Sequence, residues 1–224
     1  MNPRDLKPGK PAVPLLLRPD RARLTKHVAQ YLTGYPNDAI AANCTFGKRH
    51  PWYKVSYDCS ANGFIGSLSH QAPRVVLNSL KLSCANGLYK LTAANGLKWR
   101  DSFAAAALST VTQISAELLA RPRGAGALKL EPSDATRLLL PVPYQNLDAK
   151  ACRELVNRTD TLLRGGQSDV ARDLVDEMLL IAHSVLTRSQ LSELRTELEI
   201  IRSERLIRGE TSTRPSSIDT LLAS

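Results

Sequence analysis

The sequence predicts an α+β protein in which a basic, β-rich domain with packed helices precedes a small all-α subdomain. Three observations lead to this prediction. Residues 1–60 carry ten Lys and Arg against four Asp and Glu, residues 61–146 carry nine against four, and residues 147–224 carry eleven against thirteen. Short segments rich in β-branched and aromatic residues, bounded by Gly, Pro and Asn, lie before residue 146. After that residue the apolar positions recur at helical spacing.

The chain is expected to divide near Asn146, because Pro141 and Pro143 interrupt the regular pattern there. We predict a basic domain over residues 1–146, a helical subdomain over 147–210 and a disordered tail over 211–224, which is rich in Ser and Thr. With 224 residues, of which 43% are hydrophobic, the chain can bury a substantial core.

The basic part begins with an extended piece over 11–19, where three prolines prevent a helix. A helix capped by Asp20 is expected to follow and to end at Gly34. Strands are predicted over 51–57, 63–68, 74–80 and 88–92. A helix over 101–120 and a Gly-rich loop over 121–130 come next, followed by one helical turn over 132–137 and a buried strand over 138–143. The helical subdomain should contain helices at 148–163, 168–185 and 189–208.

The motifs of common catalytic and cofactor sites are missing from this sequence. It has no Gly-rich nucleotide-binding loop, no G-x-S-x-G and no C-x-x-C. We therefore predict no catalytic residue and no metal site in this chain. Cys residues stand singly at 44, 59, 84 and 152, which favours a reducing cytosol over a disulfide scaffold. No apolar run approaches the roughly 20 residues of a membrane-spanning helix.

A positive charge excess confined to the first 146 residues favours contact with a polyanion, although an inert basic surface that keeps the protein soluble is the alternative. Cations and an aromatic ring that could bind phosphate or stack on a base are clustered at Lys48, Arg49, Trp52 and Lys54. If 51–57 is a strand, Trp52 and Tyr53 point to opposite faces, so one of them is core and the other available. The alternative is that both are core.

Two further groups complete the candidate surface. Arg74 and Asn78 would share a strand face and are residue types that read base edges, but Asn78 could equally satisfy a turn backbone. The loop cations and glycines Arg121, Arg123, Gly124, Gly126 and Lys129 would allow a backbone to approach a phosphate closely, or would form only a flexible connection.

The order of several motifs resembles a known family. These motifs are Arg49-x-x-Trp52-Tyr53, Pro73-Arg74 with Asn78, Asn86-Gly87-Leu88-Tyr89, a helix ending in Leu118-Leu119-Ala120, Gly124-Ala-Gly-Ala-Leu-Lys-Leu130 and Val142-Pro143. Together they resemble the C-terminal target-recognition region of N6-adenine DNA methyltransferases from restriction–modification systems. The ending of the region is also similar to the recognition domains of Type I specificity subunits, and Asp160-x-Leu-Leu-Arg164 resembles the helical tail of some such enzymes. The resemblance covers about residues 11–208.

The resemblance implies a non-catalytic specificity subunit or module that grips the major groove of double-stranded DNA. It implies that a separate catalytic domain binds S-adenosylmethionine and transfers the methyl group, so no cofactor is expected in this chain. Pro141-Val142-Pro143-Tyr144 lacks the amide and the paired prolines with which adenine-methylating enzymes hold a flipped base.

We therefore expect a split subunit, a fragment or a truncated remnant of such an enzyme. Its partner would be a methyltransferase or restriction subunit. Its location would be the prokaryotic cytoplasm, at the nucleoid when DNA is bound. Two alternatives remain open: a helical assembly adaptor whose basic surface is incidental, and a nuclease, for which no Asp/Glu-x-Lys cluster stands out.

Overall fold

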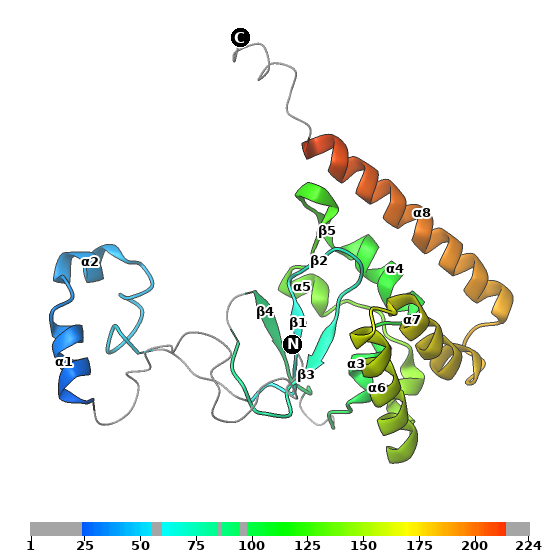
Figure 1. The fold of residues 1–224 in the computed structure, drawn as a ribbon, viewed down its shortest axis with the longest axis horizontal. Helices are drawn as coiled ribbons and strands as arrows, with labels where there is room; N and C mark the ends of the chain where they lie inside the picture. Colours follow the sequence, from blue (N-terminus) through cyan, green and yellow to red (C-terminus); the bar gives the residue numbers. More distant parts are fainter. Residues whose placement is uncertain (1–23, 55–59, 85–86, 95–97, 214–224) are drawn as a thin grey trace, which may run out of the picture. The chain divides into compact units, whose positions relative to one another are not determined.

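The computed structural model describes residues 24–54, 60–84, 87–94 and 98–213, and the chain divides into the units Met1–Cys59 and Ser60–Ser224 (Figure 1). Several predicted features lie outside the described residues. They are the extended piece 11–19, the cap Asp20, strand residues 55–57, Asn86 and the part of the tail from residue 214 onward.

The first unit contains α1 (Lys26–Thr33) and α2 (Asn37–Ala42) in its described part. Thr25 is the N-cap of α1, because its side-chain oxygen accepts a hydrogen bond from the Val28 amide. Gly34 is the C-cap. The predicted helix and its end are confirmed, but the predicted start is wrong, because α1 begins at Lys26 and Thr25 is its cap in place of Asp20.

The strand predicted over 51–57 is wrong for its described part. Residues 51–54 form turns and a bend. The Trp52 ring packs against Tyr35 and Phe46, with ring centroids 5.0 and 5.1 Å away. The aromatic residues that favour a strand by propensity are used here in a local cluster, and tertiary packing overrides the propensity.

The described part of the second unit contains two small antiparallel sheets. In one sheet, β1 (Gly63–Gly66) lies between β3 (Val75–Leu77) and β4 (Leu88–Leu91), with Phe64 opposite both Val76 and Lys90. In the other, β6 (Leu128–Lys129) lies between β2 (Leu68–Ser69) and β5 (Arg121–Pro122). The strands predicted at 63–68, 74–80 and 88–92 are present in shortened form, in agreement with the α+β class.

The helix predicted over 101–120 is two helices, α3 (Ser102–Ala106) and α4 (Thr110–Leu119). Ser109 begins α4, because its side chain accepts a hydrogen bond from the Thr112 amide. A Ser in a cap position ends one helix and starts another even within an Ala-rich segment, because it satisfies an otherwise unpaired amide. The chain then passes through β5, the short turn η2 (Gly124–Gly126) and β6 to α5 (Pro132–Ala135), the predicted helical turn.

The buried strand predicted over 138–143 is wrong. Leu139 is 62% exposed and Val142 is 65% exposed, and η3 (Val142–Gln145) is a 3-10 turn. The Leu139 backbone bonds to two side chains of α4: its carbonyl accepts from Thr112 Oγ1 at 2.7 Å, and its amide donates to Ser115 Oγ at 3.0 Å. These bonds replace the ladder that a neighbouring strand would supply.

The C-terminal helices are close to their predicted positions. They are α6 (Ala149–Arg164), α7 (Ser168–Asp176) with its π-helical continuation η4 (Glu177–Ile181), and α8 (Arg188–Thr213). The second predicted helix ends at Ile181 and not at residue 185, and α8 extends past the predicted end of the helical subdomain. Figure 1 shows α8 running along one side of the second unit.

Two buried clusters hold the second unit together. One joins Ile65 of β1 to Ala120 after α4, to Leu128 of β6 and to Leu130, which follows β6. The other joins Ala105, Ala106 and Leu108 to Leu147, Leu155, Val175 and Leu179. This second cluster contains residues from both sides of the boundary predicted near 146, and the unit itself begins at Ser60. The assignment of 1–146 and 147–210 as separate domains stays a prediction.

Candidate nucleic-acid interface

Residues 121–130, named here the basic hairpin, present exposed cations on a short antiparallel pair. Arg121 lies opposite Lys129 and Pro122 opposite Leu128. The Arg123 amide donates to the Ala127 carbonyl at 2.7 Å, which closes the turn. Arg121 and Arg123 are exposed, and no ion pair joins either of them to another described residue. They are therefore available to an anionic partner.

The positive charges of the basic hairpin lower the pKa of a neighbouring carboxylate, that of Glu131. Lys129 Nζ lies 2.8 Å from Glu131 Oε1. The pKa of Glu131 is lowered, chiefly by its hydrogen bond from Lys129 and further by the charges of Lys129, Arg121 and Arg123. All three cations thus favour the ionised form of the same carboxylate.

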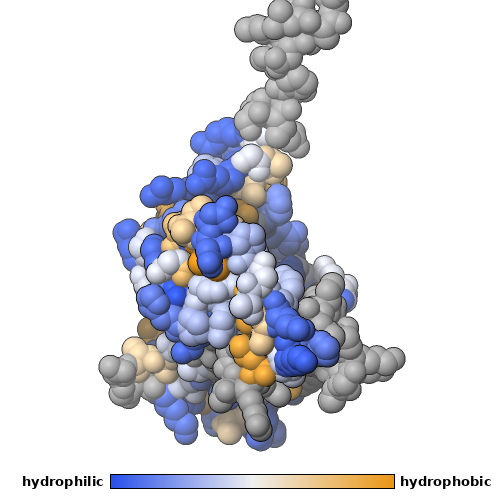
Figure 2. Space-filling view, turned by 90° about the vertical axis from the view of Figure 1, so that its left-hand side faces the viewer, coloured by the Kyte–Doolittle hydropathy of each residue, from blue (hydrophilic) through white to orange (hydrophobic). Residues whose placement is uncertain are grey.

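The surface in Figure 2 is mainly hydrophilic, with hydrophobic side chains in small separate patches.

The two glycines of the basic hairpin have different surroundings. A Cβ on Gly124 would meet nothing within 4 Å, so its backbone is open to approach. Gly126 is buried, has a φ of +68°, and a Cβ there would lie 2.9 Å from Leu206 Cδ2 of α8. Helix α8 therefore covers Gly126. This packing explains the glycine and leaves Gly126 outside the exposed surface.

Arg74 and Asn78 also differ from each other. Arg74 is exposed and donates from Nη2 to Ser168 Oγ of α7 at 2.9 Å. Asn78 is 4% exposed, and its amide nitrogen donates to the Ala61 and Leu82 carbonyls at 3.0 and 2.9 Å. Its Oδ1 accepts from the Leu82 amide at 2.8 Å. These bonds favour the alternative interpretation, a residue that satisfies a turn, over one that reads bases.

The first unit carries the remaining candidates. Lys48 and Lys54 are exposed, Arg49 is half-buried, and Trp52 is half-buried in the aromatic cluster. Tyr53 lies edge-on to Trp52 with ring centroids 5.7 Å apart, so both aromatics share the cluster and neither stands alone. These cations belong to a different unit from the basic hairpin, and a single candidate surface that includes both groups stays a prediction.

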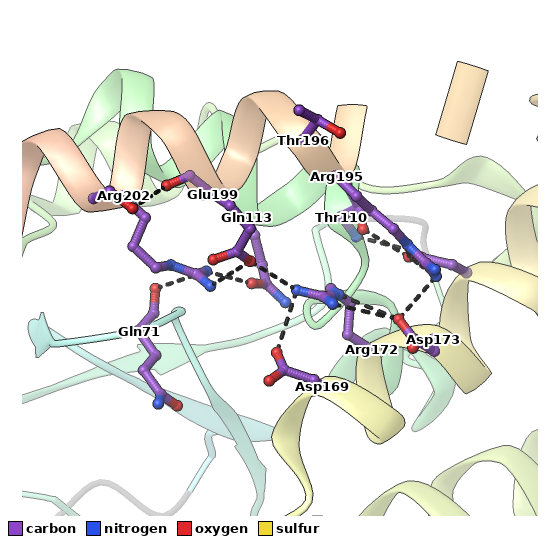
Figure 3. Close-up of polar contacts among 12 residues, drawn as sticks. Gln71, Thr110, Gln113, Asp169, Arg172, Asp173, Arg195, Thr196, Glu199 and Arg202 are labelled. Carbon is purple, nitrogen blue, oxygen red and sulfur yellow. Dashed lines mark hydrogen bonds and ion pairs between the residues drawn. The ribbon is translucent and has the colours of Figure 1, made fainter. Parts of the chain in front are cut away.

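The inner face of α8 carries buried and half-buried residues that were not predicted from the sequence. This face repeats at alternating spacings of four and three residues: Leu191, Arg195, Leu198, Arg202, Arg205 and Gly209. Its arginines bind carboxylates of the neighbouring helices, as Figure 3 shows for Arg195 with Asp173 of α7. Arg195 also binds Asp176 at 2.9 Å, and Asp176 accepts from the Thr110 amide of α4. These arginines are neutralised inside the protein, so they add little to an external positive field.

Some signal for this face is present in the sequence. Leu191 and Leu198 stand seven residues apart and the three arginines continue the same heptad-like spacing, which indicates a helix face that packs against a partner. The residues that this face packs against could not be predicted from the sequence, because they are distant: Glu117 lies 88 residues from Arg205.

These features define a basic chain of the α+β class. A family model matches residues 5–180, and its description is Type II methyltransferase M.Eco57I, C-terminal domain. The chain belongs to this family, which confirms the resemblance to the C-terminal region of an adenine methyltransferase. The matched stretch ends before α8. Searches of curated proteins and of solved structures gave no match. Among the described helices, none combines the length and apolar character needed to cross a bilayer.

Proposed function

We propose that this chain is the DNA-recognition part of an N6-adenine methyltransferase system. The family supports this proposal, since the chain belongs to the C-terminal domains of Type II methyltransferases. In the proposal, methyl transfer and S-adenosylmethionine binding belong to the catalytic domain that such a region serves. The residues of this chain hold duplex DNA and orient it toward that domain.

The observation that carries the proposal is the basic hairpin. Arg121 and Arg123 are exposed and unpaired among the described residues, and Arg121 lies opposite Lys129 in the paired strands. A guanidinium binds a phosphate or a guanine edge with two parallel hydrogen bonds, which fixes register as well as supplying affinity. Gly124 has open space beside it, so its backbone can approach a phosphate.

We expect the double variant Arg121→Ala, Arg123→Ala to bind a mixed-sequence DNA duplex roughly tenfold more weakly than the unaltered chain near physiological salt. Fluorescence anisotropy of a labelled duplex measures this. The matched control is Arg158→Ala, Arg188→Ala, which removes the same net charge from exposed arginines paired with Glu154 and Glu177. The control should change the Kd by less than about twofold, because long-range charge alone contributes little near physiological salt.

An equal loss of duplex affinity in both double variants would show that the hairpin arginines contribute only through the net charge of the protein, and it would contradict their direct contact with DNA. Absence of duplex binding at low salt would contradict the proposal, and it would favour the assembly adaptor.

A further inference from the structure

Arg205 of α8 joins three segments that are far apart in the sequence. It is 3% exposed. Its Nε and Nη2 donate to the two carboxylate oxygens of Glu117 on α4, at 2.8 and 2.9 Å. Its Nη2 also donates to the His70 carbonyl at 3.0 Å, after β2, and its Nη1 donates to the Gly126 carbonyl in the basic hairpin.

Helix α8 makes a second contact with the hairpin one turn further on. A Cβ on Gly209 would overlap the backbone of Gly126, lying 2.6 Å from its Cα. Only a glycine lets the two backbones approach this closely. The hairpin is therefore held by a guanidinium on its carbonyl and by direct backbone packing.

A third contact reaches the segment that follows β2 of the same small sheet. Arg202 Nη2 donates to Gln113 Oε1 of α4 at 2.7 Å and to the Gln71 carbonyl at 3.5 Å (Figure 3). The carbonyls of His70 and Gln71 directly follow β2, which pairs with β6 of the hairpin. Arg202 and Arg205 thus hold β2 and the hairpin against α4.

The basic hairpin needs such support. Each of its strands has two residues, and paired strands of this length are not stable by themselves in water. If the hairpin were mobile in the free protein, DNA binding would have to order it, and the free-energy cost of this ordering would reduce affinity.

We propose that α8 is a brace that fixes the basic hairpin in its DNA-binding geometry, with Arg205 as the positioning residue. This inference rests on the proposed function. It adds that a helix outside the stretch matched by the family model sets DNA affinity without touching DNA. Arg205 is not positioned to contact a phosphate, since it is buried and each of its three nitrogens donates to an oxygen of the protein.

The test is the substitution Arg205→Lys, which retains the positive charge beside Glu117 but loses the planar fork that reaches Glu117, His70 and Gly126 together. We expect the hydrogen-bonded backbone amides of Arg123 and Ala127 to exchange hydrogen at least about tenfold faster, since the hairpin opens locally. Duplex affinity should fall roughly fivefold. The slope of log K against log salt should be unchanged, because no phosphate contact is removed.

Gly209→Ala is the second variant, which disturbs the same contact without changing any donor or charge. It should reproduce both effects. Arg208→Lys is the control, because Arg208 lies on the exposed side of α8 and should leave exchange and affinity as they are. Exchange in α6 reports whether each variant remains folded.

The outcomes separate the two proposals. Faster hairpin exchange with unchanged duplex affinity in both variants would overturn the inference, and so would unchanged exchange. Failure of the unaltered chain to bind duplex would overturn the proposed function. Faster exchange, weaker affinity and an unchanged salt slope would establish the brace.

Discussion

Asp176 illustrates how a single carboxylate can connect three helices. Its side chain is fully buried at the end of α7. Oδ1 accepts from the Thr110 amide at 2.9 Å, and Oδ2 accepts from Thr110 Oγ1 at 2.6 Å and from Arg195 Nη2 at 2.9 Å. The Asp176 carboxylate therefore places a negative charge at the N-terminus of α4, although it lies in a distant part of the sequence. It also binds Arg195 of α8.

Asp176→Asn should lower the free energy of unfolding by about 2–3 kcal/mol. The amide is nearly isosteric, but its NH₂ must face either the Thr110 backbone amide or the Arg195 guanidinium, and a donor then faces a donor. Urea unfolding followed by circular dichroism measures the loss. Asp173→Asn is the control, because Asp173 also binds Arg195 but is half exposed, and it should cost less than about 1 kcal/mol. Similar losses for both variants would contradict this account of Asp176.

At the scale of elements, α6 shows a titratable cap. Asp148 Oδ1 accepts from the Lys150 and Ala151 amides at 2.8 and 2.7 Å. These backbone hydrogen bonds, that of Ala151 first, hold the pKa of Asp148 below its ordinary value of 3.8. Because the pKa is lower in the folded state, the stabilisation is complete above 3.8 and is lost as the pH falls through the folded-state pKa.

We therefore expect Asp148→Ala to be less stable than the unaltered chain at neutral pH, with the difference narrowing below about pH 4. Asp148→Ser retains a capping oxygen that does not titrate. Its stability relative to Asp148→Ala should be independent of pH, as thermal unfolding at several pH values would show. A stability difference between the unaltered chain and the Asp148→Ala variant that stayed constant through the acid range would contradict the role of the ionised cap.

Elements with local signals could be predicted from the sequence, and those set by distant partners could not. Asp148 and Gly165 mark both ends of α6 within the segment itself, so its position was predictable. The apolar run at Leu138-Leu139-Leu140 is too short to distinguish a strand from an irregular segment, and Thr112 and Ser115 decide the outcome. In the same way, the exposed charge of Arg121 is apparent from composition, whereas the burial of Gly126 depends on α8, about 80 residues away.

At the scale of the whole molecule, the core of the second unit crosses residue 146. Leu155 is fully buried in a cluster that includes Ala105, Ala106 and Leu108. Leu155→Ala should therefore destabilise the segments on both sides, by about 2–5 kcal/mol. Val142→Ala is the exposed control and should change stability by less than about 0.5 kcal/mol.

The two sides can be followed separately in a Trp52→Phe background, where Trp99 is the single tryptophan. Trp99 fluorescence reports the segment before residue 146, since its ring contacts Phe103, and far-ultraviolet circular dichroism reports the helices. Both transitions should shift together in Leu155→Ala. Separate transitions, with only the helical one affected, would show that 147–210 folds independently.

The central claim is that the basic hairpin contacts phosphates of duplex DNA, and the salt dependence of binding tests it most directly. The slope of log K against log salt should be shallower for Arg121→Ala, Arg123→Ala than for the unaltered chain, by about 0.9 for each arginine that neutralises a phosphate. For Arg158→Ala, Arg188→Ala the slope should equal that of the unaltered chain. A slope that stays the same when Arg121 and Arg123 are removed would contradict the claim.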